Sequence, residues 1–459
     1  MNFSNGKAAL MAGCLIVFTL NARADVVTDW NLKAGELIVD AKLGTPPANR
    51  VMALVQTAVY EAVRAAALRQ PGDAAALDAA VAAANRSTLL KLMPTQEPAI
   101  SAAYQAALAK LPEGAAKTAG ITAGEQAAAA VLARRADDGA ATPERYRPHT
   151  TPGIYVPTAA MAAPQWPQRK PWLMASASQF RPGPPPALTS AQWARDYEEV
   201  KTLGAKAGSK RSAEQTEVAR FWEFSLPPIY HAVLRSVATQ PGRSVAQNAR
   251  FYATATQAMD DAMIAVFDAK YHYNFWRPIT AIRNGDADGN NATQPEAAWA
   301  SLIDPPLHPE YPSAHSILAG TLGVVLQAEA GAGALPVLSA SSPSAQGATR
   351  RWRQVDDFTQ EVANSRIWAG IHYRTSGEVG LAMGQKIGAL AVAQMATVPI
   401  AEAQLVERVA VRGVQVYECR ADAGAAGGVS EVFVAPHAEL FAPQARAIPW
   451  LLLTGANGG

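Results

Sequence analysis

The sequence predicts a mainly α-helical protein: a helical-bundle domain with a short β appendage at its C-terminus. Apolar residues recur at helical spacing through most of residues 25–398, and alanine, the strongest helix former, is used heavily there. Alternating apolar and polar residues, typical of strands, are confined to 408–436. With 459 residues, 49% hydrophobic and 17% charged, the chain can bury a large core.

Residues 1–24 have the pattern of a signal peptide. Lys7 provides a thin positive region, an apolar run follows it, and the A-R-A at 22–24 is a cleavage signal. We expect cleavage after Ala24 and a periplasmic or secreted mature protein; a retained membrane anchor is the alternative. No later segment approaches 18 uninterrupted apolar residues, so we expect no membrane insertion.

Charge and cysteine usage exclude several functions. The net charge is +2 with no basic run, which argues against nucleic acid as a partner. The chain has two cysteines, Cys14 and Cys419, and the first lies in the predicted signal peptide. A disulfide framework, a cysteine-based zinc site and a thiol redox pair are therefore not expected. Nothing in the sequence predicts the oligomeric state.

The first part of the domain is predicted to be helical scaffold. Apolar positions at 3–4 spacing, broken by proline and glycine, indicate helices near 50–67, 73–93, 97–111 and 113–136.

Residues 140–190 differ in composition, with eleven prolines and aromatic residues at Tyr146, Tyr155, Trp166 and Trp172. Flexible linkers seldom carry so many aromatics, so we predict a structured, wrapping arm. The arm either lines a substrate channel or packs its own aromatics on the surface.

Helical periodicity returns after the arm. Helices are expected at 190–204, 213–225, 228–239, 243–272, 313–330, 351–368 and 376–397, with a Gly/Ser/Ala loop at 331–348. The helix ending near Lys270 carries three carboxylates, Asp260, Asp261 and Asp268, which we expect to face solvent or to serve in helix packing. Residues 408–459 resemble the start of a small bacterial β domain and are expected to be a truncated copy of one.

Three short segments carry the residues suited to chemistry. The first is KYHYNFWRP, in which Lys270 and Arg277 are two helical turns apart. If the helix continues, both cations share one face before Pro278 ends or bends it. The alternative is a pair of solvated surface charges.

The second segment is YPSAH, residues 311–315. Ser313 is a good N-cap for the apolar helix that follows. The backbone N–H groups of Ala314 and His315, with the helix dipole, would favour an anion just before that helix. The alternative is a capping serine with an unrelated histidine.

The third segment is SRIWAGIH, with Arg366 and His372. Gly370 suggests that the helix breaks, so that His372 lies in a loop. Thr375 and Glu378 form a T-x-x-E capping box that would start the next helix. The alternative is a surface arginine and a turn histidine.

Taken together, the order K-x6-R-P, P-S-x-H, S-R-x5-H resembles the signature of the phosphatidic acid phosphatase type 2 and vanadium haloperoxidase superfamily. Four of the seven histidines fall between residues 270 and 372. Residues 50–67, DAMIAVFDAKYHYN and the helix after Thr375 further resemble the soluble bacterial haloperoxidase-like branch. The resemblance covers about 25–398.

The resemblance implies an oxyanion pocket between two helical bundles. Lys270, Arg277 and Arg366 would neutralise vanadate or phosphate, and Ser313 and the N–H of Ala314 would hydrogen-bond its oxygens. Three cations suit a trianionic tetrahedral group.

The histidines would carry the chemistry. His372 would be the ligand to vanadium or the nucleophile on phosphorus, and His315 the acid/base residue. In a haloperoxidase, Lys270 would polarise peroxide and a halide would become hypohalous acid. In a phosphatase, His315 would protonate the leaving group of a phosphate ester. His272 matches no motif position.

Two positions depart from the family pattern. Ala314 replaces a glycine, and a positive φ there would cost about 1 kcal/mol or more. Four residues after His372, the family has an aspartate that orients this histidine, and Ser376 stands there instead. Loss of such a carboxylate typically lowers metal affinity or activity about 10–100-fold. A weakened or inactive enzyme is therefore among the alternatives.

His308 bears on the choice of halide. It lies seven residues before His315, where the resemblance implies a histidine for bromoperoxidases and an aromatic residue for chloroperoxidases. An ordinary turn residue before Pro309 is the alternative. We therefore predict a vanadium-dependent haloperoxidase that uses hydrogen peroxide and a halide, bromide favoured. A periplasmic acid phosphatase without vanadate and a non-catalytic oxyanion-binding protein are the alternatives.

Overall fold

The computed structural model describes residues 25–331, 333–396, 410–421 and 429–441. The predicted signal peptide therefore lies outside the described residues. The chain divides into two compact units, Met1–Ala401 and Glu402–Gly459, which are considered separately below.

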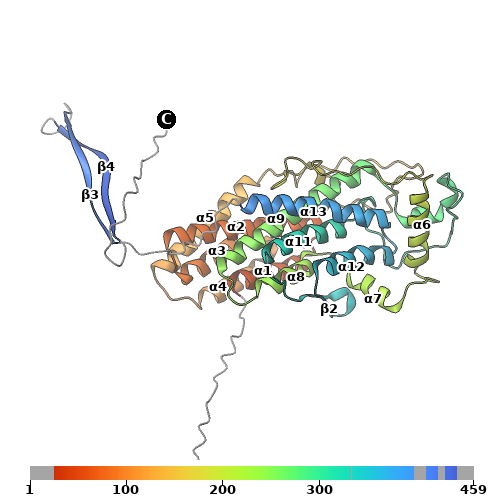
Figure 1. Ribbon diagram of the computed structural model, residues 1–459, viewed down its shortest axis with the longest axis horizontal. Coiled ribbons are helices and arrows are strands. Elements are labelled where there is room, and N and C mark those ends of the chain that lie inside the picture. Colours follow the sequence, from red (N-terminus) through yellow and green to blue (C-terminus); the bar gives the residue numbers. More distant parts are fainter. Residues whose placement is uncertain (1–24, 332, 397–409, 422–428, 442–459) are drawn as a thin grey trace, which may run out of the picture. The chain divides into compact units, whose positions relative to one another are not determined.

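The regular secondary structure of the first unit is almost entirely helical (Figure 1). The helices are α1 Val26–Asp40, α2 Thr45–Arg69, α3 Ala74–Leu92, α4 Glu97–Leu108, α5 Ala115–Arg134, α6 Ala191–Gly204, α7 Ala213–Phe221, α8 Pro227–Ala238, α9 Val245–Tyr273, α10 Pro278–Arg283, α11 Ala314–Ala330, α12 Val355–Trp368 and α13 Arg374–Ala396. The strands are β1 Leu338–Ser342, β2 Ala348–Trp352, β3 Ala410–Ala421 and β4 Val429–Phe441.

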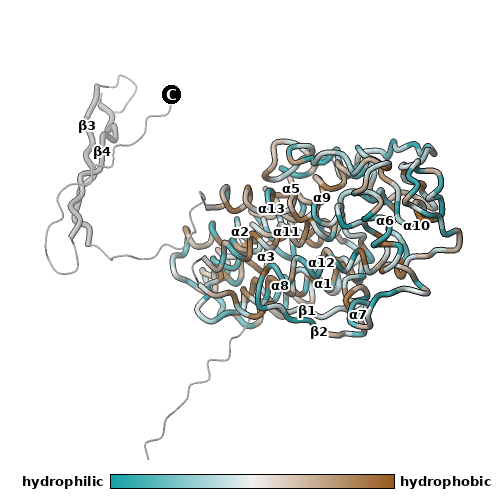
Figure 2. Tube along the Cα trace, turned by 45° about the vertical axis from the view of Figure 1, so that its right-hand side comes forward, coloured by the Kyte–Doolittle hydropathy of each residue, from teal (hydrophilic) through white to brown (hydrophobic). Residues whose placement is uncertain are grey.

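The long helix α9 joins two groups of helices. On one side it packs against α2, which in turn packs against α3 and α5; on the other side it packs against α11 and α13. Hydrophobic residues concentrate where these helices meet (Figure 2). Helix α2 is long and apolar enough to cross a membrane, but 78% of its most apolar window is buried, as in a core helix. The predicted mainly α-helical fold is confirmed.

Helices α11 and α13 are in close backbone contact through glycines of α13. A Cβ at Gly380 would lie 2.7 Å from the carbonyl oxygen of Ser313, and one at Gly384 would collide with that of Ile317. Gly388 faces the carbonyl of Thr321 in the same way. The absence of side chains at these positions lets the two helices approach to contact.

The arm at 140–190 is anchored by the carboxylates of α9. Asp260 accepts from Arg169 Nη1 at 2.6 Å and from Trp172 Nε1 at 2.8 Å. Asp261 accepts the backbone N–H of Trp172, Leu173 and Met174. Asp268 pairs with Arg181 at 2.7 Å. Of the two expected roles, exposure to solvent is wrong for Asp260 and Asp261, which are fully buried, and the packing that they serve joins α9 to the arm.

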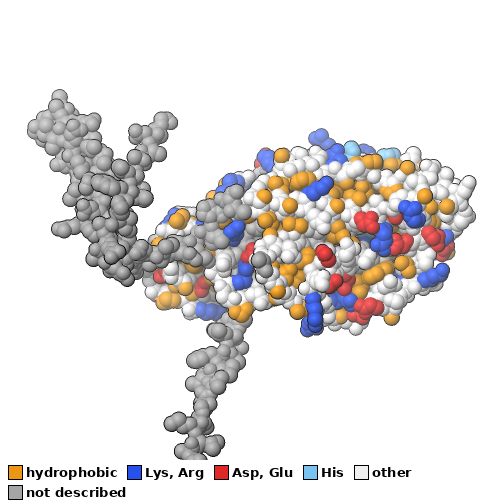
Figure 3. All heavy atoms as spheres, in the orientation of Figure 1, with side chains coloured by type: hydrophobic (Ala, Val, Ile, Leu, Met, Phe, Trp, Pro, Cys, Tyr) orange, Lys and Arg blue, Asp and Glu red, His pale blue; other side chains and the backbone are white. Residues whose placement is uncertain are grey.

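The loop predicted at 331–348 is also partly wrong. Strands β1 and β2 form an antiparallel hairpin there, with Leu338 opposite Trp352, and Ser339 N bonds to Ser236 on α8. In the second unit β3 and β4 form an antiparallel pair, in agreement with the predicted β appendage. On the face shown in Figure 3, basic and acidic side chains are interspersed.

Candidate functional site

The loop 308–310, which precedes α11, gathers the cations of the first segment. Lys270 Nζ donates to the carbonyls of Pro309 at 3.0 Å and Glu310 at 2.8 Å. Arg277 Nε and Nη2 both donate to the carbonyl of His308 at 3.0 Å. Both cations are fully buried.

Lys270 and Arg277 do not share a helix face as predicted. Helix α9 ends at Tyr273, where Asn274 adopts a left-handed conformation with φ of 49°. Arg277 is instead the N-cap of the short helix α10, and Pro278 begins that helix rather than ending one. The two cations meet because both reach the same loop, which is a tertiary contact that helical spacing cannot predict.

Arg366, in the last turn of α12, connects the third segment to the second. Its Nη1 lies 2.7 Å from His315 Nε2 and donates to the carbonyl of Trp222 at 2.7 Å. Its Nε and Nη2 are buried and have no hydrogen-bond partner among the described residues. A buried arginine with unsatisfied N–H groups is costly unless an acceptor binds there.

His372 lies in the break between α12 and α13, as predicted. Gly370 has φ of 79°, and a Cβ there would collide with the carbonyl of Gly204. His372 Nδ1 lies 2.7 Å from Glu310 Oε1, and its Nε2 lies 3.3 Å from Arg277 Nη1. Arginine only donates, so Nε2 must accept and the ring proton lies on Nδ1. The lone pair of Nε2 therefore faces the cations.

Ser313 caps α11, as predicted. Its Oγ accepts from Ser316 N at 3.3 Å and from Ser316 Oγ at 3.0 Å, so its own O–H remains available to donate. Ala314 is the first helical residue and is not among the described residues with positive φ, which removes the expected strain. Its N–H belongs to the first helical turn, which has no intrahelical acceptor.

Ser376 does not face His372 directly. Its Oγ donates to Glu310 Oε2 at 2.7 Å, and its carbonyl accepts from Ser313 N at 3.0 Å. The predicted capping box of Thr375 and Glu378 is wrong: α13 begins at Arg374, and the N–H of Thr375 bonds to Asp196 on α6.

The electrostatics of the site are dominated by buried positive charge. Burial lowers the pKa of Arg277 and of Arg366 to about 10, so both stay charged at neutral pH. Burial, followed by the charge of Arg277, lowers the pKa of Lys270 well below its usual value. Burial raises the pKa of Glu310 to about 7, against the opposing pull of Arg277 and Lys270.

The three histidines of the site are neutral at neutral pH. Burial, followed by the nearby cations, lowers the pKa of His308, His315 and His372 well below the usual value. His308 Nδ1 lies 3.0 Å from Arg277 Nη2 and must accept from it. A neutral imidazole is the form that binds a metal or attacks phosphorus.

We call Lys270, Arg277, Arg366, Ser313, His315 and His372 the anion cage. The structure brings together all nine residues predicted for the site, including Ala314, His308 and Ser376. Most are buried, but Ala314, His315 and His308 are partly exposed and mark the side that solvent reaches. Among the described residues, no group of three or more His, Cys, Asp or Glu side chains could hold a metal ion. The donor set fits a tetrahedral oxyanion instead.

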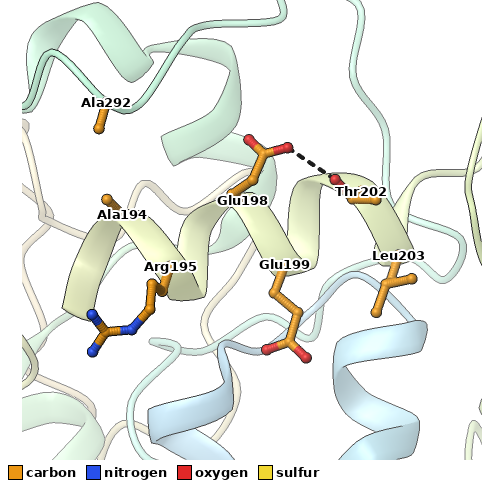
Figure 4. Close-up of a pocket in the computed structure, with 7 residues that line it drawn as sticks. All are labelled: Ala194, Arg195, Glu198, Glu199, Thr202, Leu203 and Ala292. Carbon is orange, nitrogen blue, oxygen red and sulfur yellow. Dashed lines mark hydrogen bonds between the residues drawn. The ribbon is translucent and has the colours of Figure 1, made fainter. Parts of the chain in front are cut away.

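A separate groove lies on the outer side of α6, lined by Ala194, Arg195, Glu198, Glu199, Thr202, Leu203 and Ala292 (Figure 4). None of these residues was predicted for the site. Thr202 donates to Glu198, and Glu199 pairs with Arg374 at the start of α13, so its polar groups serve the local packing.

Comparison with known proteins finds a family match in the second half of the first unit. Residues 250–399, which hold the entire anion cage, match the family model of the VCPO second helical-bundle domain. A vanadium chloroperoxidase from Curvularia inaequalis is 23% identical over 208 residues, covering 38% of this chain and 34% of that protein. The match thus spans about a third of that relative.

Solved structures show the same fold over a larger share of the chain. A bacterial vanadium-dependent iodoperoxidase matches with a TM-score of 0.67 and 24% identity, covering 80% of this chain and 95% of the other. A bacterial vanadium-dependent chloroperoxidase in its apo form matches with a TM-score of 0.63 and 18% identity, covering 78% and 95%.

The fold is therefore that of the vanadium haloperoxidases, with residues 250–399 as the second helical bundle. The family model over residues 250–399 and the related chloroperoxidase both support the phosphatidic acid phosphatase type 2 and vanadium haloperoxidase superfamily, which the order of the three motifs predicted.

Two contributors to the site were missed by the sequence analysis. Glu310 lies within the quoted segment LHPEYPSAH, but its partner His372 is 62 residues further on, and no local spacing indicates the contact. Trp222 contributes only its carbonyl, for which a sequence has no signal.

Proposed function

We propose that this protein is a vanadium-dependent haloperoxidase that oxidises a halide, with bromide favoured, by hydrogen peroxide. The observation that supports it most is the uncompensated positive charge of the anion cage. Arg277, Arg366 and Lys270 are buried, and among the described residues Glu310 is the one carboxylate that bonds to a member of the cage. A buried excess of cations is stable when an anion binds among them.

The residues present fit vanadate. The two unpartnered nitrogens of Arg366, Nε and Nη2, supply donors, and the free O–H of Ser313 and the first amides of α11 supply others. His372 Nε2 offers the single lone pair that vanadium would take as ligand. When bound, vanadate supplies the centre at which hydrogen peroxide is activated to oxidise halide.

The chain's own residues would then position the bound anion and transfer protons to and from it. Lys270 and Arg277 orient the anion through a loop fixed by their hydrogen bonds to carbonyls. His315, neutral and partly exposed, would pass protons between the bound substrate and solvent. Arg366 Nη1 donates to His315 Nε2, so the same arginine would bind the anion and position the residue that transfers protons.

The preference for bromide rests on His308. Its ring contacts Phe267 at 5.2 Å between centroids and its Nδ1 bonds to Arg277, so it forms part of the wall beside the cage. A histidine at this place is what the family resemblance associates with bromoperoxidases. Export through the segment 1–24 is likewise part of the proposal.

An acid phosphatase is the second candidate, because the same cage fits phosphate and the lone pair of His372 Nε2 could attack phosphorus. One assay series separates the two. Purified protein is tested for chloride, bromide and iodide oxidation with peroxide, with and without vanadate, and for phosphate-ester hydrolysis. Vanadate-dependent bromide oxidation supports the proposal. Hydrolysis that vanadate inhibits supports the phosphatase instead.

Substitution of the proposed ligand tests the site itself. His372→Ala should lose both activities, since it removes the Nε2 lone pair that the proposal assigns to vanadium or phosphorus. The matched control is His272→Ala, which removes an exposed histidine two residues beyond Lys270. Equal activity in the two variants would overturn the assignment of His372.

A further inference from the structure

We propose that Glu310 is the positioning residue that fixes the imidazole of His372 for binding vanadate. Ser376 in turn holds the carboxylate of Glu310 in place through a hydrogen bond. The inference rests on the proposed function. It places the orienting carboxylate 62 residues before His372, on a different loop, rather than four residues after it, where this chain has Ser376.

Glu310 is fully buried, and its hydrogen bonds hold it in one orientation. Oε1 lies 2.7 Å from His372 Nδ1 and accepts from the N–H of Tyr373 at 3.0 Å. Oε2 accepts from Ser376 Oγ at 2.7 Å. Its own N–H bonds to the carbonyl of Phe275, and its carbonyl accepts from Lys270. Both oxygens and both backbone groups are therefore occupied.

These contacts determine which ring nitrogen of His372 carries the proton. Glu310 accepts on the Nδ1 side, while Arg277, which has only donors, lies on the Nε2 side at 3.3 Å. Two independent partners thus select the same tautomer, with the proton on Nδ1. A carboxylate behind the ring also makes Nε2 a stronger ligand.

Ser376 therefore belongs to the same hydrogen-bonded chain as Glu310 and His372. A second carboxylate at 376 would face Glu310 at hydrogen-bond distance, and two buried carboxylates repel each other. A hydroxyl at that position donates instead and stabilises the charge on Glu310. This explains how the site can dispense with an acid after His372.

If Glu310 positions His372, replacing it should change the affinities for vanadate and for inorganic phosphate in different directions. Vanadate needs the lone pair of His372 as a ligand, whereas inorganic phosphate binds through charge and hydrogen bonds alone. Glu310→Gln keeps the shape but removes a negative charge beside an anion. We expect vanadate affinity to fall about 10–100-fold, while phosphate affinity stays equal or rises.

The experiment measures binding of vanadate and of inorganic phosphate by calorimetry in wild type, Glu310→Gln and Ser376→Ala. Glu378→Gln, an exposed glutamate on α13, is the matched control and should change neither. Ser376→Ala should weaken vanadate binding less than Glu310→Gln does. Parallel losses of both anions in Glu310→Gln would mean a general disruption of the pocket and would overturn the proposal.

A second measurement does not depend on vanadate. The ¹⁵N spectrum of the imidazoles in the wild-type protein, assigned with His372→Ala, should show His372 as a neutral ring protonated at Nδ1. A ring protonated at Nε2 would overturn the role of Glu310. If the protein oxidises no halide but His372 has the Nδ1–H form, the proposed function fails and the positioning role stands.

Discussion

Two regions of this protein bury several charges each, and they do so in opposite ways. The first is the anchor network between α9 and the arm, formed by Arg50, Arg135, Arg169, Asp138, Asp260 and Asp261. It has three cations and three carboxylates, joined by contacts such as Arg169 to Asp138 at 2.8 Å and Arg169 to Asp260 at 2.6 Å. Its charges balance within the protein.

The second region is the anion cage, in which three cations bond mainly to carbonyls and histidines. The Nε and Nη2 of Arg366 lack partners, and Glu310 is the one carboxylate bonded to a member of the cage among the described residues. A balanced set of buried charges stabilises a fold, whereas an unbalanced set needs a ligand to complete it. The contrast gives a physical criterion for separating a structural ion network from a binding site.

The largest expected effect is in the anchor network. Arg169→Met leaves the buried carboxylate of Asp260 without its cation, so the free energy of unfolding should fall by about 3–5 kcal/mol. Chemical denaturation of the purified variant measures it. A loss below about 1 kcal/mol would show that the anchor network does not hold the arm.

Vanadate should stabilise the wild-type protein, because it binds the folded cage and not the unfolded chain. At a concentration 100 times its dissociation constant, the free energy of unfolding should rise by about 2.7 kcal/mol. Denaturation with and without vanadate measures the increment. Arg169→Met, if it folds, should keep it, since the anchor network does not bind the anion.

The matched substitution in the cage, Arg366→Met, should behave differently from Arg169→Met. Two hydrogen bonds of Nη1 are lost, but so are a buried charge and two unsatisfied donors, so we expect stability to change by less than about 1 kcal/mol. Affinity for vanadate and phosphate should fall about 10–100-fold, because a charged hydrogen bond is worth about 1.5–3 kcal/mol. A destabilisation as large as that of Arg169→Met would erase the distinction between the two regions.

The smallest effect should come from the outer end of the arm. Arg181 pairs with Asp268 while its side chain is 30% exposed, so solvent screens the pair. Arg181→Gln should cost about 0.2–1 kcal/mol in the same denaturation experiment. A cost near that of Arg169→Met would mean that exposure does not govern these pairs.

The sequence predicted the elements of this fold better than their contacts. The Ser313 cap, the break at Gly370 and the helix after it follow from local chemistry and are present. The spacing of Lys270 and Arg277 suggested a shared helix face, whereas the two side chains meet through the loop 308–310. Motif order selected residues that lie together in the structure, although the geometric reason was different.

What the sequence could not predict are pairs that are far apart in the chain. Asp260 and Asp261 resemble surface carboxylates until the arm, some 88 residues earlier, covers them. Ser376 suggested a weakened site, and the sequence gives no sign that it bonds to Glu310, which in turn bonds to His372. In each case a buried carboxylate is meaningful only with a partner that periodicity and spacing cannot supply.

The glycines of α13 have a mechanical consequence for the site. Helices α11 and α13 are in backbone contact at Gly380 and Gly384. Because protein interiors are close-packed, sliding or separating the two helices would open a gap along their interface. Ser313 opens one of these helices and His372 precedes the other, and the bond from Ser313 N to the Ser376 carbonyl joins their ends. The spacing between the Ser313 hydroxyl and the His372 imidazole is thus set by the packing of α11 against α13.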